Sequence, residues 1–226
     1  MTERKNPAPA DGVRAMQAKA PDWREGDTLG SYMARKPKPK LEPAKLYAPR
    51  KLDIGCGHRK QPGFKGIDLA GDADITWDLF QFPWPIKTSS VSEAHCQHFV
   101  EHIPHYRPEF GGQDGWWLFW GEVYRIMRRN GTVRVIHPYA MHARAFWDPT
   151  HERYIHEGTW AYLDRGWRER ELIDHYGAPV DFEIVTINGM GIPDSIASRN
   201  QEYQDHARTH FWNIIEDLEV VLRCRK

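Results

Sequence analysis

Hydrophobic and polar positions change their pattern near residue 45 of the chain. From there on, short apolar runs bounded by turn residues alternate with longer segments of helical periodicity. This alternation is typical of an α/β protein, in which the strands form one sheet and helices pack on it. The predicted strands are Lys51–Ile54, Gly66–Leu69, Asp74–Trp77, Val91–His98, Thr132–Ile136, Phe182–Ile187 and Leu218–Cys224. Five strands followed by a late pair favour an open twisted sheet with helices on both faces.

Two helices stand out between the predicted strands. The first covers Trp116–Arg129, where the apolar side chains fall on one face and two arginines suit the C-terminal end. Its apolar positions are Trp117, Trp120, Val123, Ile126 and Met127. The second covers Arg168–His175. We expect the first helix to pack on the sheet between the strands that flank it.

The N-terminal part of the chain has a different composition. Seven prolines and few large apolar groups occur in the first fifty residues, which carry 11 Lys and Arg against 6 Asp and Glu, a net charge of +5. Such a segment buries too little apolar surface to offset the entropy of ordering. We therefore expect residues 1–44 to be a flexible, basic arm and residues 45–226 to form one domain. The arm would be a solvated leader or would bind an acidic or nucleic-acid partner.

The candidate chemistry lies where the predicted strands end. In an open α/β sheet, ligands bind outside the carboxyl ends of the strands. The first strand ends in Gly55-Cys56-Gly57, where glycines allow a sharp turn and close approach of a ligand. Asp68 ends the second strand, and a carboxylate there can accept hydrogen bonds from both hydroxyls of a ribose. Asp78 ends the third strand, where the exocyclic amine of a purine could donate to it.

Other nucleotide sites fit these residues less well. The dinucleotide fingerprint GxGxxG lacks its third glycine, because Lys60 stands in that place, and Asp68 follows Gly57 too closely. The connection from His58 to Lys65 is also too short for a full phosphate-binding helix. No GxxxxGK[ST] loop occurs. A site for NAD, FAD or a nucleoside diphosphate is therefore disfavoured.

The motifs taken in order resemble those of class I S-adenosylmethionine-dependent methyltransferases. The resemblance covers about residues 51–136 and rests on Leu52-Asp53-Ile54-Gly55-Cys56-Gly57, Pro62-Gly63-Phe64-Lys65-Gly66-Ile67-Asp68-Leu69, Asp78-Leu79 and His98-Phe99-Val100-Glu101-His102-Ile103. It implies a Rossmann-like, mostly parallel sheet with an antiparallel last strand, and S-adenosyl-L-methionine as cofactor. By the resemblance, the cofactor-binding residues are Asp53, Gly55, Cys56, Gly57, Asp68, Leu69, Asp78, Leu79 and His98, with the methionine part over the glycine turn and beside His98.

The sequence departs from two branches of that family. The segment His98-Phe99-Val100-Glu101 stands where enzymes that methylate amines of nucleic acids carry Asp/Asn-Pro-Pro-Tyr/Phe. A Pro-Cys nucleophile for methylation of cytosine C5 is also missing, because Cys96 follows His95. The acceptor stays open: a small molecule, a sugar or another group. The alternative is a catalytically inactive, methyltransferase-like binding or structural protein that keeps the nucleoside pocket.

Two histidines are candidates for the base that deprotonates an acceptor. His137 follows the fifth strand, and His151 lies in Asp148-Pro149-Thr150-His151, within a stretch of about residues 138–170 that we expect to form a lid-like insertion. The row His95, His98, His102 and His105 suggests a metal site, but a change from strand to helix within it would break the ligand spacing. No metal is therefore expected.

Composition adds three exclusions. The 31 basic and 31 acidic residues cancel, so no global field points to nucleic acid. The three cysteines form no CxxC pair, which supports neither a disulfide framework nor a cysteine zinc site. No apolar run is long enough to span a membrane and the polar start is unlike a signal peptide, so we expect a cytoplasmic protein. The oligomeric state stays open.

Overall fold

A seven-stranded sheet forms the centre of the protein. The computed structural model describes residues 45–226 except 70 and 177, so the expected arm lies outside the described residues. The strands are β1 (Lys51–Ile54), β2 (Lys65–Asp68), β3 (Ile75–Thr76), β4 (Val91–Gln97), β5 (Met127–Pro138), β6 (Phe182–Met190) and β7 (Asp217–Cys224). Each overlaps a strand that the sequence predicts. β5 begins earlier than expected, and β6 continues further.

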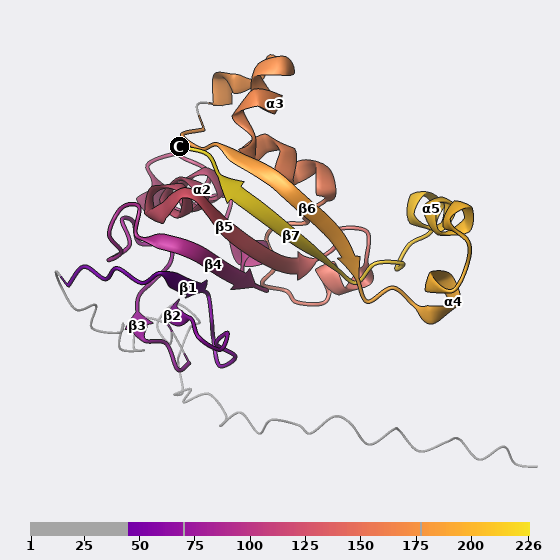
Figure 1. The fold of residues 1–226 in the computed structure, drawn as a ribbon, viewed down its shortest axis with the longest axis horizontal. Coiled ribbons are helices and arrows are strands. Elements are labelled where there is room, and N and C mark those ends of the chain that lie inside the picture. The colour runs from indigo at the N-terminus through magenta and orange to yellow at the C-terminus, as the bar shows by residue number, and fades with distance from the viewer. Residues whose placement is uncertain (1–44, 70, 177) are drawn as a thin grey trace, which may run out of the picture. The chain divides into compact units, whose positions relative to one another are not determined.

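The strand order is β3-β2-β1-β4-β5-β7-β6 (Figure 1). β1 pairs in parallel with β2 and β4, and the parallel pairing extends to β3 on one side and β5 on the other. β7 is antiparallel to both β5 and β6, between which it lies. The prediction of a mostly parallel, Rossmann-like open sheet with an antiparallel last strand is therefore confirmed.

The helices are distributed unevenly along the chain. The described residues contain no helix between β1 and β4. The α-helices of the described residues are α2 (Gly115–Ile126), α3 (Arg165–Arg170), α4 (Asp194–Ala197) and α5 (Gln201–His210). Short 3-10 helices complete the fold at η1 (Val100–His102), η2 (Pro108–Phe110), η3 (Ala143–Phe146), η4 (Glu157–Leu163) and η5 (Asp174–Tyr176). The predicted helix over Arg168–His175 is thus replaced by α3 and η5.

α2 is the helix that the apolar pattern predicts, and its start is well defined. The Asp114 side chain accepts a hydrogen bond from the Trp116 amide (2.7 Å), which satisfies an otherwise free donor of the first turn. A Cβ on Gly115 would come within 2.2 Å of the Pro104 carbonyl oxygen, so only glycine fits there. The helix ends at Ile126, and β5 begins at the next residue. It is therefore shorter than predicted.

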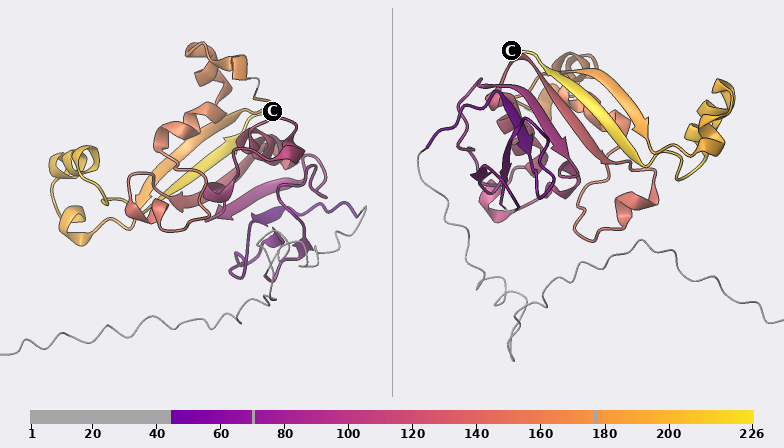
Figure 2. Two further views of the ribbon diagram at one scale, coloured as in Figure 1. Left: turned by 180° about the vertical axis from the view of Figure 1, so that it is seen from behind. Right: turned by 60° about the horizontal axis from the view of Figure 1, so that its bottom comes forward.

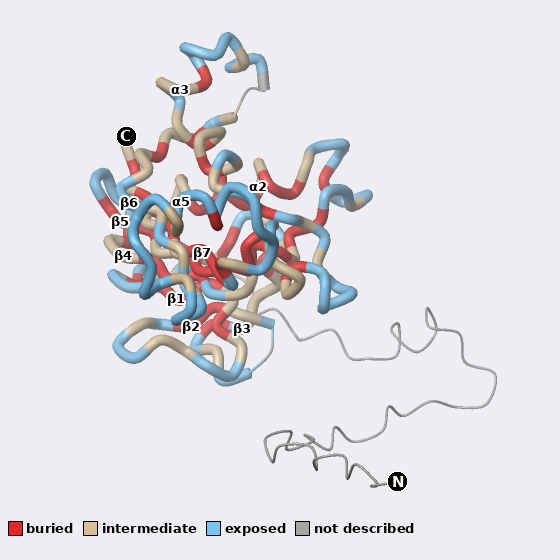
Figure 3. The backbone as a smooth tube through the Cα atoms, turned by 90° about the vertical axis from the view of Figure 1, so that its right-hand side faces the viewer, coloured by how far each residue is buried: buried red, intermediate tan, exposed pale blue. Residues whose placement is uncertain are grey.

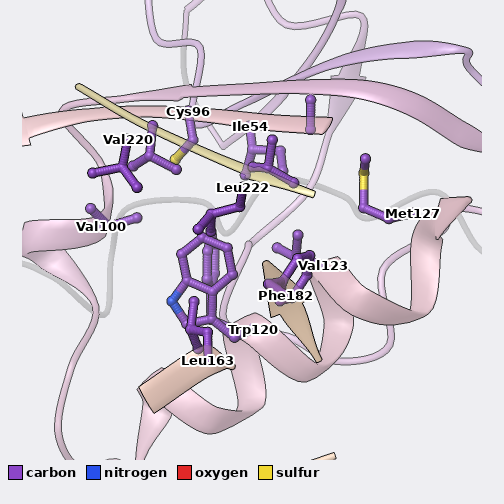
Figure 4. Packing of buried hydrophobic residues seen from close by; sticks show 14 of the residues in the cluster. Ile54, Cys96, Val100, Trp120, Val123, Met127, Leu163, Phe182, Val220 and Leu222 are labelled. Carbon is purple, nitrogen blue, oxygen red and sulfur yellow. The ribbon is translucent and has the colours of Figure 1, made fainter. Parts of the chain in front are cut away.

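One face of the sheet carries the hydrophobic core. Ile54, Cys96 and Val220 point from their strands toward Trp120 and Val123 of α2 (Figure 4). Trp160 of η4 packs edge-on against Trp120, with 5.5 Å between ring centroids. Buried positions follow the strands and α2, whereas the outer turns are exposed (Figure 3). The tryptophans at these places therefore serve packing.

The opposite face of the central strands carries polar side chains. Asp53 Oδ1 lies 2.9 Å from His95 Nδ1, and His95 Nε2 lies 3.4 Å from Arg134 Nη1. Arg134 in turn pairs with Glu219, which accepts a 3.4 Å hydrogen bond from Asn188. This polar row crosses β1, β4, β5, β7 and β6. Asp53 and His95 are buried although no helix from the β1–β4 connections covers them.

A segment between β6 and β7 was not predicted from the sequence. It contains α4 and α5, which lie beyond the ends of these strands and away from the rest of the sheet (Figures 1 and 2). α5 is strongly polar, and Ala207 is its buried position. Few of its side chains are apolar, so a search for apolar runs does not find it. Among the described residues, no helix has the length and apolar character needed to cross a membrane.

Candidate functional site

The carboxyl ends of the five parallel strands meet at one edge of the sheet. Gly55, Asp68 and His98 directly follow or end their strands there. β7 runs the other way, so its first residue, Asp217, pairs with Pro138 at the last position of β5. The edge therefore brings together the glycine turn and Asp68, whose carboxylate the sequence predicts to bind a ribose. His98 and Asp217 lie at the same edge.

The glycine turn is sharp, as the sequence predicts, and the group that lies closest to the Cβ position of Gly55 is the Phe99 ring. Gly55 has φ +70°, and a Cβ there would lie 2.4 Å from the Phe99 ring. Gly57 has φ +48°, and a Cβ there would meet no atom within 4 Å. Any larger side chain at Gly55 would therefore displace Phe99, whereas the backbone at Gly57 borders open space that a ligand can approach.

A direct hydrogen bond joins the first two predicted motifs. The Gly57 amide donates to Asp68 Oδ2 at 2.9 Å, so the carboxylate at the end of β2 also fixes the turn after β1. The Gly55 amide donates to the Ile67 carbonyl oxygen at 3.0 Å. Leu69, the next residue after Asp68, is exposed. Two segments that are separated in the sequence thus form one structural unit.

Two other predicted binding residues support that turn from beneath. Asp53 lies inside β1 rather than at its tip, and its Oδ2 accepts a 2.6 Å hydrogen bond from the Gln61 amide. Cys56 is buried, and burial raises the pKa of its thiol to about 11. Its sulfur lies close to Gly66, where a Cβ would be only 2.5 Å away. The positions of both residues indicate that they hold the loop in shape.

The third predicted motif forms a turn after β3. Asp78 Oδ1 accepts a 2.9 Å hydrogen bond from the Phe80 amide. Leu79 is 3% exposed and belongs to the hydrophobic core. Phe80 is half-buried and stacks on Phe99, with centroids 5.6 Å apart. Phe80 is therefore more exposed at this edge than Leu79. The adenine contacts of Asp78 and Leu79 stay predictions.

A cavity of about 260 Å³ lies at the tips of β4 and β5. Its lining includes His98, Glu101, Arg144, Trp147, Asp148 and His151. His98 Nδ1 is 3.4 Å from Glu101 Oε1, and its Nε2 is 3.7 Å from Asp217 Oδ2. Arg144 donates to that same Asp217 oxygen at 3.1 Å. The cavity thus combines imidazoles, carboxylates and one guanidinium in a small volume.

The stretch expected as a lid-like insertion supplies part of this cavity. Arg144, Trp147, Asp148 and His151 all come from it. The amides of Glu152 and Arg153 donate to the Glu101 carbonyl oxygen at 2.9 and 3.0 Å, which fixes the stretch to η1. Trp147 is largely exposed beside the cavity. The predicted His151 therefore does reach the same cavity as the predicted His98.

The structure does not support His137 as a base. Its side chain has no exposed surface and packs against Trp160, with 5.5 Å between ring centroids. Burial lowers its pKa to about 4, against an ordinary value of 6.5. The reason is the two-residue period of a strand: Val133, Val135 and His137 share the face that α2 and η4 cover. The imidazole points into the core rather than to the strand tip.

Several residues of the cavity were not singled out from the sequence. Arg144 lines it, and Asp217 lies beside it and accepts a hydrogen bond from Arg144, although no sequence motif marks either position. The row of four histidines is also divided: His95 joins the polar row, and His105 is exposed beside Asp114. The polar segment Asp148–His151 is the sequence signal that points to this cavity. The residues that it meets there, Glu101 and His102, lie about fifty positions earlier in the chain.

Comparison with known proteins identifies the fold. No protein-family model matches the chain, and no curated protein matches it either. Among solved structures, a SAM-dependent methyltransferase from Archaeoglobus fulgidus matches 80% of this chain and 88% of its own, with 16% identity and a TM-score of 0.51. An S-adenosylmethionine-dependent methyltransferase from Mesorhizobium loti, at 12% identity, covers 80% of this chain and 93% of its own, with a TM-score of 0.45. The chain has the Rossmann-like fold of class I S-adenosylmethionine-dependent methyltransferases.

Proposed function

We propose that this protein is a methyltransferase that uses S-adenosyl-L-methionine and transfers its methyl group to an acceptor bound beside His98. The observation that carries the proposal is the 2.9 Å hydrogen bond between the Gly57 amide and Asp68. It places an open glycine turn and a carboxylate side by side at the carboxyl edge of the sheet. A nucleoside that lies over the turn can present its ribose hydroxyls to that carboxylate.

The proposed division of labour follows the strand tips. Residues 55–57, 68 and 78 would hold the cofactor, with the sulfonium end toward His98. The sulfonium is already a strong electrophile, so the protein mainly aligns the acceptor with the methyl group. The 260 Å³ cavity next to His98 is small enough to orient one functional group of an acceptor. Trp147 beside it offers an aromatic surface for the rest.

Calorimetric titration with S-adenosylmethionine and with its demethylated product tests cofactor binding. Asp68→Asn keeps an acceptor for the Gly57 amide but removes the charge that would bind the ribose hydroxyls. We expect it to weaken binding of both ligands at least about tenfold. Asp72→Asn is the matched control, because it removes one carboxylate from the exposed loop nearby. Absence of binding by the folded wild-type protein would overturn the proposal.

Turnover needs its own test, because a binding protein with a nucleoside pocket would pass the first one. Radiolabelled methyl transfer from the cofactor would be followed with separate pools of small molecules, sugars and macromolecules. Label that enters one pool and depends on Asp68 would establish an enzyme and its acceptor class. Cofactor binding without transfer to any pool would favour the inactive, methyltransferase-like alternative.

A further inference from the structure

Three side chains of the types that bind metals meet at the edge of the cavity. Glu101 and His102 belong to η1, and His151 comes from the stretch after β5. One carboxylate oxygen and one ring nitrogen from each histidine all lie within 4.8 Å of one another. Glu101 is buried, whereas the two imidazoles are half-exposed. The group thus has a buried anionic end and an open side.

Both imidazoles are oriented through the same ring nitrogen. His151 Nδ1 lies 2.7 Å from the Ala145 carbonyl oxygen, and His102 Nδ1 lies 3.2 Å from that of Thr150. A carbonyl oxygen can only accept, so both Nδ1 atoms carry a proton, and in the neutral imidazole Nε2 is then the nitrogen that has a lone pair. Donation of the second N–H to a carbonyl is the usual arrangement of histidines that bind a metal.

A short relay strengthens the assignment for His102. Thr150 Oγ1 lies 3.1 Å from His102 Nδ1 and 2.7 Å from Asp148 Oδ1. The hydroxyl donates to the carboxylate and accepts from the imidazole, which again requires the proton on Nδ1. The rings of His102 and His151 meet edge-on, with 4.8 Å between centroids. The two imidazoles are therefore fixed next to each other, and Nε2 is the nitrogen that each would offer to a ligand.

The carboxylate of Glu101 has an unmet requirement. The residue is 2% exposed, and its Oε1 faces His98 at 3.4 Å. Its Oε2 is buried and has no hydrogen-bond partner among the described residues. A buried carboxylate oxygen without a partner is costly, and it is normally paired, protonated or bound to a cation. A cation bound between the three side chains would meet this requirement.

We propose that Glu101, His102 and His151 form a binding site for a divalent transition-metal ion of the zinc type. Two imidazoles and one carboxylate suit Zn²⁺, Fe²⁺ or Co²⁺, whereas Mg²⁺ prefers oxygen ligands. Ligands about 2.1 Å from a tetrahedral ion are about 3.4 Å apart, so the present separation of up to 4.8 Å requires the side chains to close by up to about 1.4 Å.

Three protein ligands leave at least one coordination position open toward the cavity. The inference deepens the proposed function, and this step rests on it: the ion would bind an oxygen of the methyl acceptor at that position. The acceptor would then be a hydroxyl compound or another oxygen donor. In this arrangement His151 is a metal ligand rather than the base that the sequence suggests, because its Nε2 cannot fulfil both roles.

Zinc titration of the metal-free, full-length protein by calorimetry tests the site. We expect one tight site per chain, weakened at least tenfold by His151→Ala and by Glu101→Gln. His210→Ala is the matched control, since His206 and His210 form a second histidine pair on α5, with centroids 4.2 Å apart. Unchanged binding in His151→Ala, or loss of the tight site in His210→Ala, would overturn the proposal.

Cobalt(II) gives a second readout that does not depend on activity. Its visible absorption reports ligand number and type, and we expect a band that His151→Ala or His102→Ala removes. His102→Ala is the substitute should Glu101→Gln fail to fold, as judged by thermal unfolding. Asp68→Asn should leave both metal signals unchanged. Asp68→Asn tests the cofactor site, so the two sites can fail independently. Loss of cofactor binding with unchanged metal signals would affect the proposed function alone.

Discussion

On one face of the central sheet, β1, β4, β5 and β7 present aliphatic side chains that are buried beneath α2 and η4. On the other face the same strands present Asp53, His95, Arg134 and Glu219 as a connected row. Each strand alternates its side chains between the two faces, so both arrangements come from one sequence pattern. Apolar packing therefore stabilises one face of the sheet, and paired charges stabilise the other.

Two buried histidines, His137 and His95, show the difference between the two faces of the sheet. His137 faces the apolar side, where its Nδ1 contacts the Pro138 carbonyl oxygen and its Nε2 has no partner among the described residues. His95 faces the polar side, where Asp53 and Arg134 contact its two ring nitrogens. The same residue type is therefore isolated in the core on one face and fully paired on the other. Substitutions on the two faces should differ in size and in their dependence on pH.

The largest effect is expected for Trp120→Ala on the apolar face. The indole is fully buried and contacts Trp116, Trp160 and Phe182 with ring centroids 5.5–5.7 Å apart. Its removal should lower the free energy of unfolding by about 4 kcal/mol, through lost burial and the cavity that remains. Denaturant unfolding measures this loss. A loss below about 1 kcal/mol would mean that the apolar face is not the main source of stability.

The next effect is expected for Asp53→Ala on the polar face. The substitution leaves His95 and the Gln61 amide without their acceptor. We expect a loss of about 3 kcal/mol, because one partner of a buried pair is left behind. Asp53→Asn is the matched variant, and it should lose less because its amide oxygen can still accept one hydrogen bond. Equal losses in the two variants would show that the charge itself is what matters.

The third effect concerns pH and His137. Its pKa is lowered to about 4 by burial, whereas in the unfolded chain it is about 6.5. Below pH 6.5 the unfolded chain takes up a proton that the folded side chain does not accept, so stability falls as the pH falls toward 4. The contribution should be about 2 kcal/mol between pH 7.5 and pH 5. Denaturant midpoints across this window should fall less steeply in His137→Leu than in the wild type.

The smallest effect is expected for the pair of Arg134 and Glu219. The Arg134 side chain is 42% exposed, so solvent screens the attraction. A double-mutant cycle with Arg134→Met and Glu219→Gln should give a coupling energy below about 1 kcal/mol, reduced further by salt. A much larger coupling would mean that the polar row acts as one cooperative network.

Much of the sheet could be predicted from the sequence, because strand ends coincide with local signals. Apolar runs and turn glycines locate β1 and β2, and the short connection after Gly57 indicates that no full helix follows β1. α2 follows from its apolar face. The segment with α4 and α5 was missed because α5 is polar nearly all around.

The site was predictable only in part, for a related reason. Gly57 and Asp68 are eleven residues apart, and the motif order assigns both to one expected site, although it does not predict the hydrogen bond between them. The meeting of Glu101 with His151 depends on long-range hydrogen bonds from the amides of Glu152 and Arg153 to the Glu101 carbonyl oxygen. Backbone contacts of this kind leave no mark in residue types. The burial of His137, by contrast, follows from the two-residue period of β5.

The segment between β6 and β7 begins and ends at neighbouring positions, because Met190 pairs with Asp217. It is therefore an excursion from a continuous strand pair, and its length does not affect the register of the sheet. Asn213 joins it to the stretch after β5 by accepting from the Ala143 amide and donating to the Met141 carbonyl oxygen. In evolutionary terms, insertions and deletions there can change the length of this excursion while the frame that holds the glycine turn stays constant.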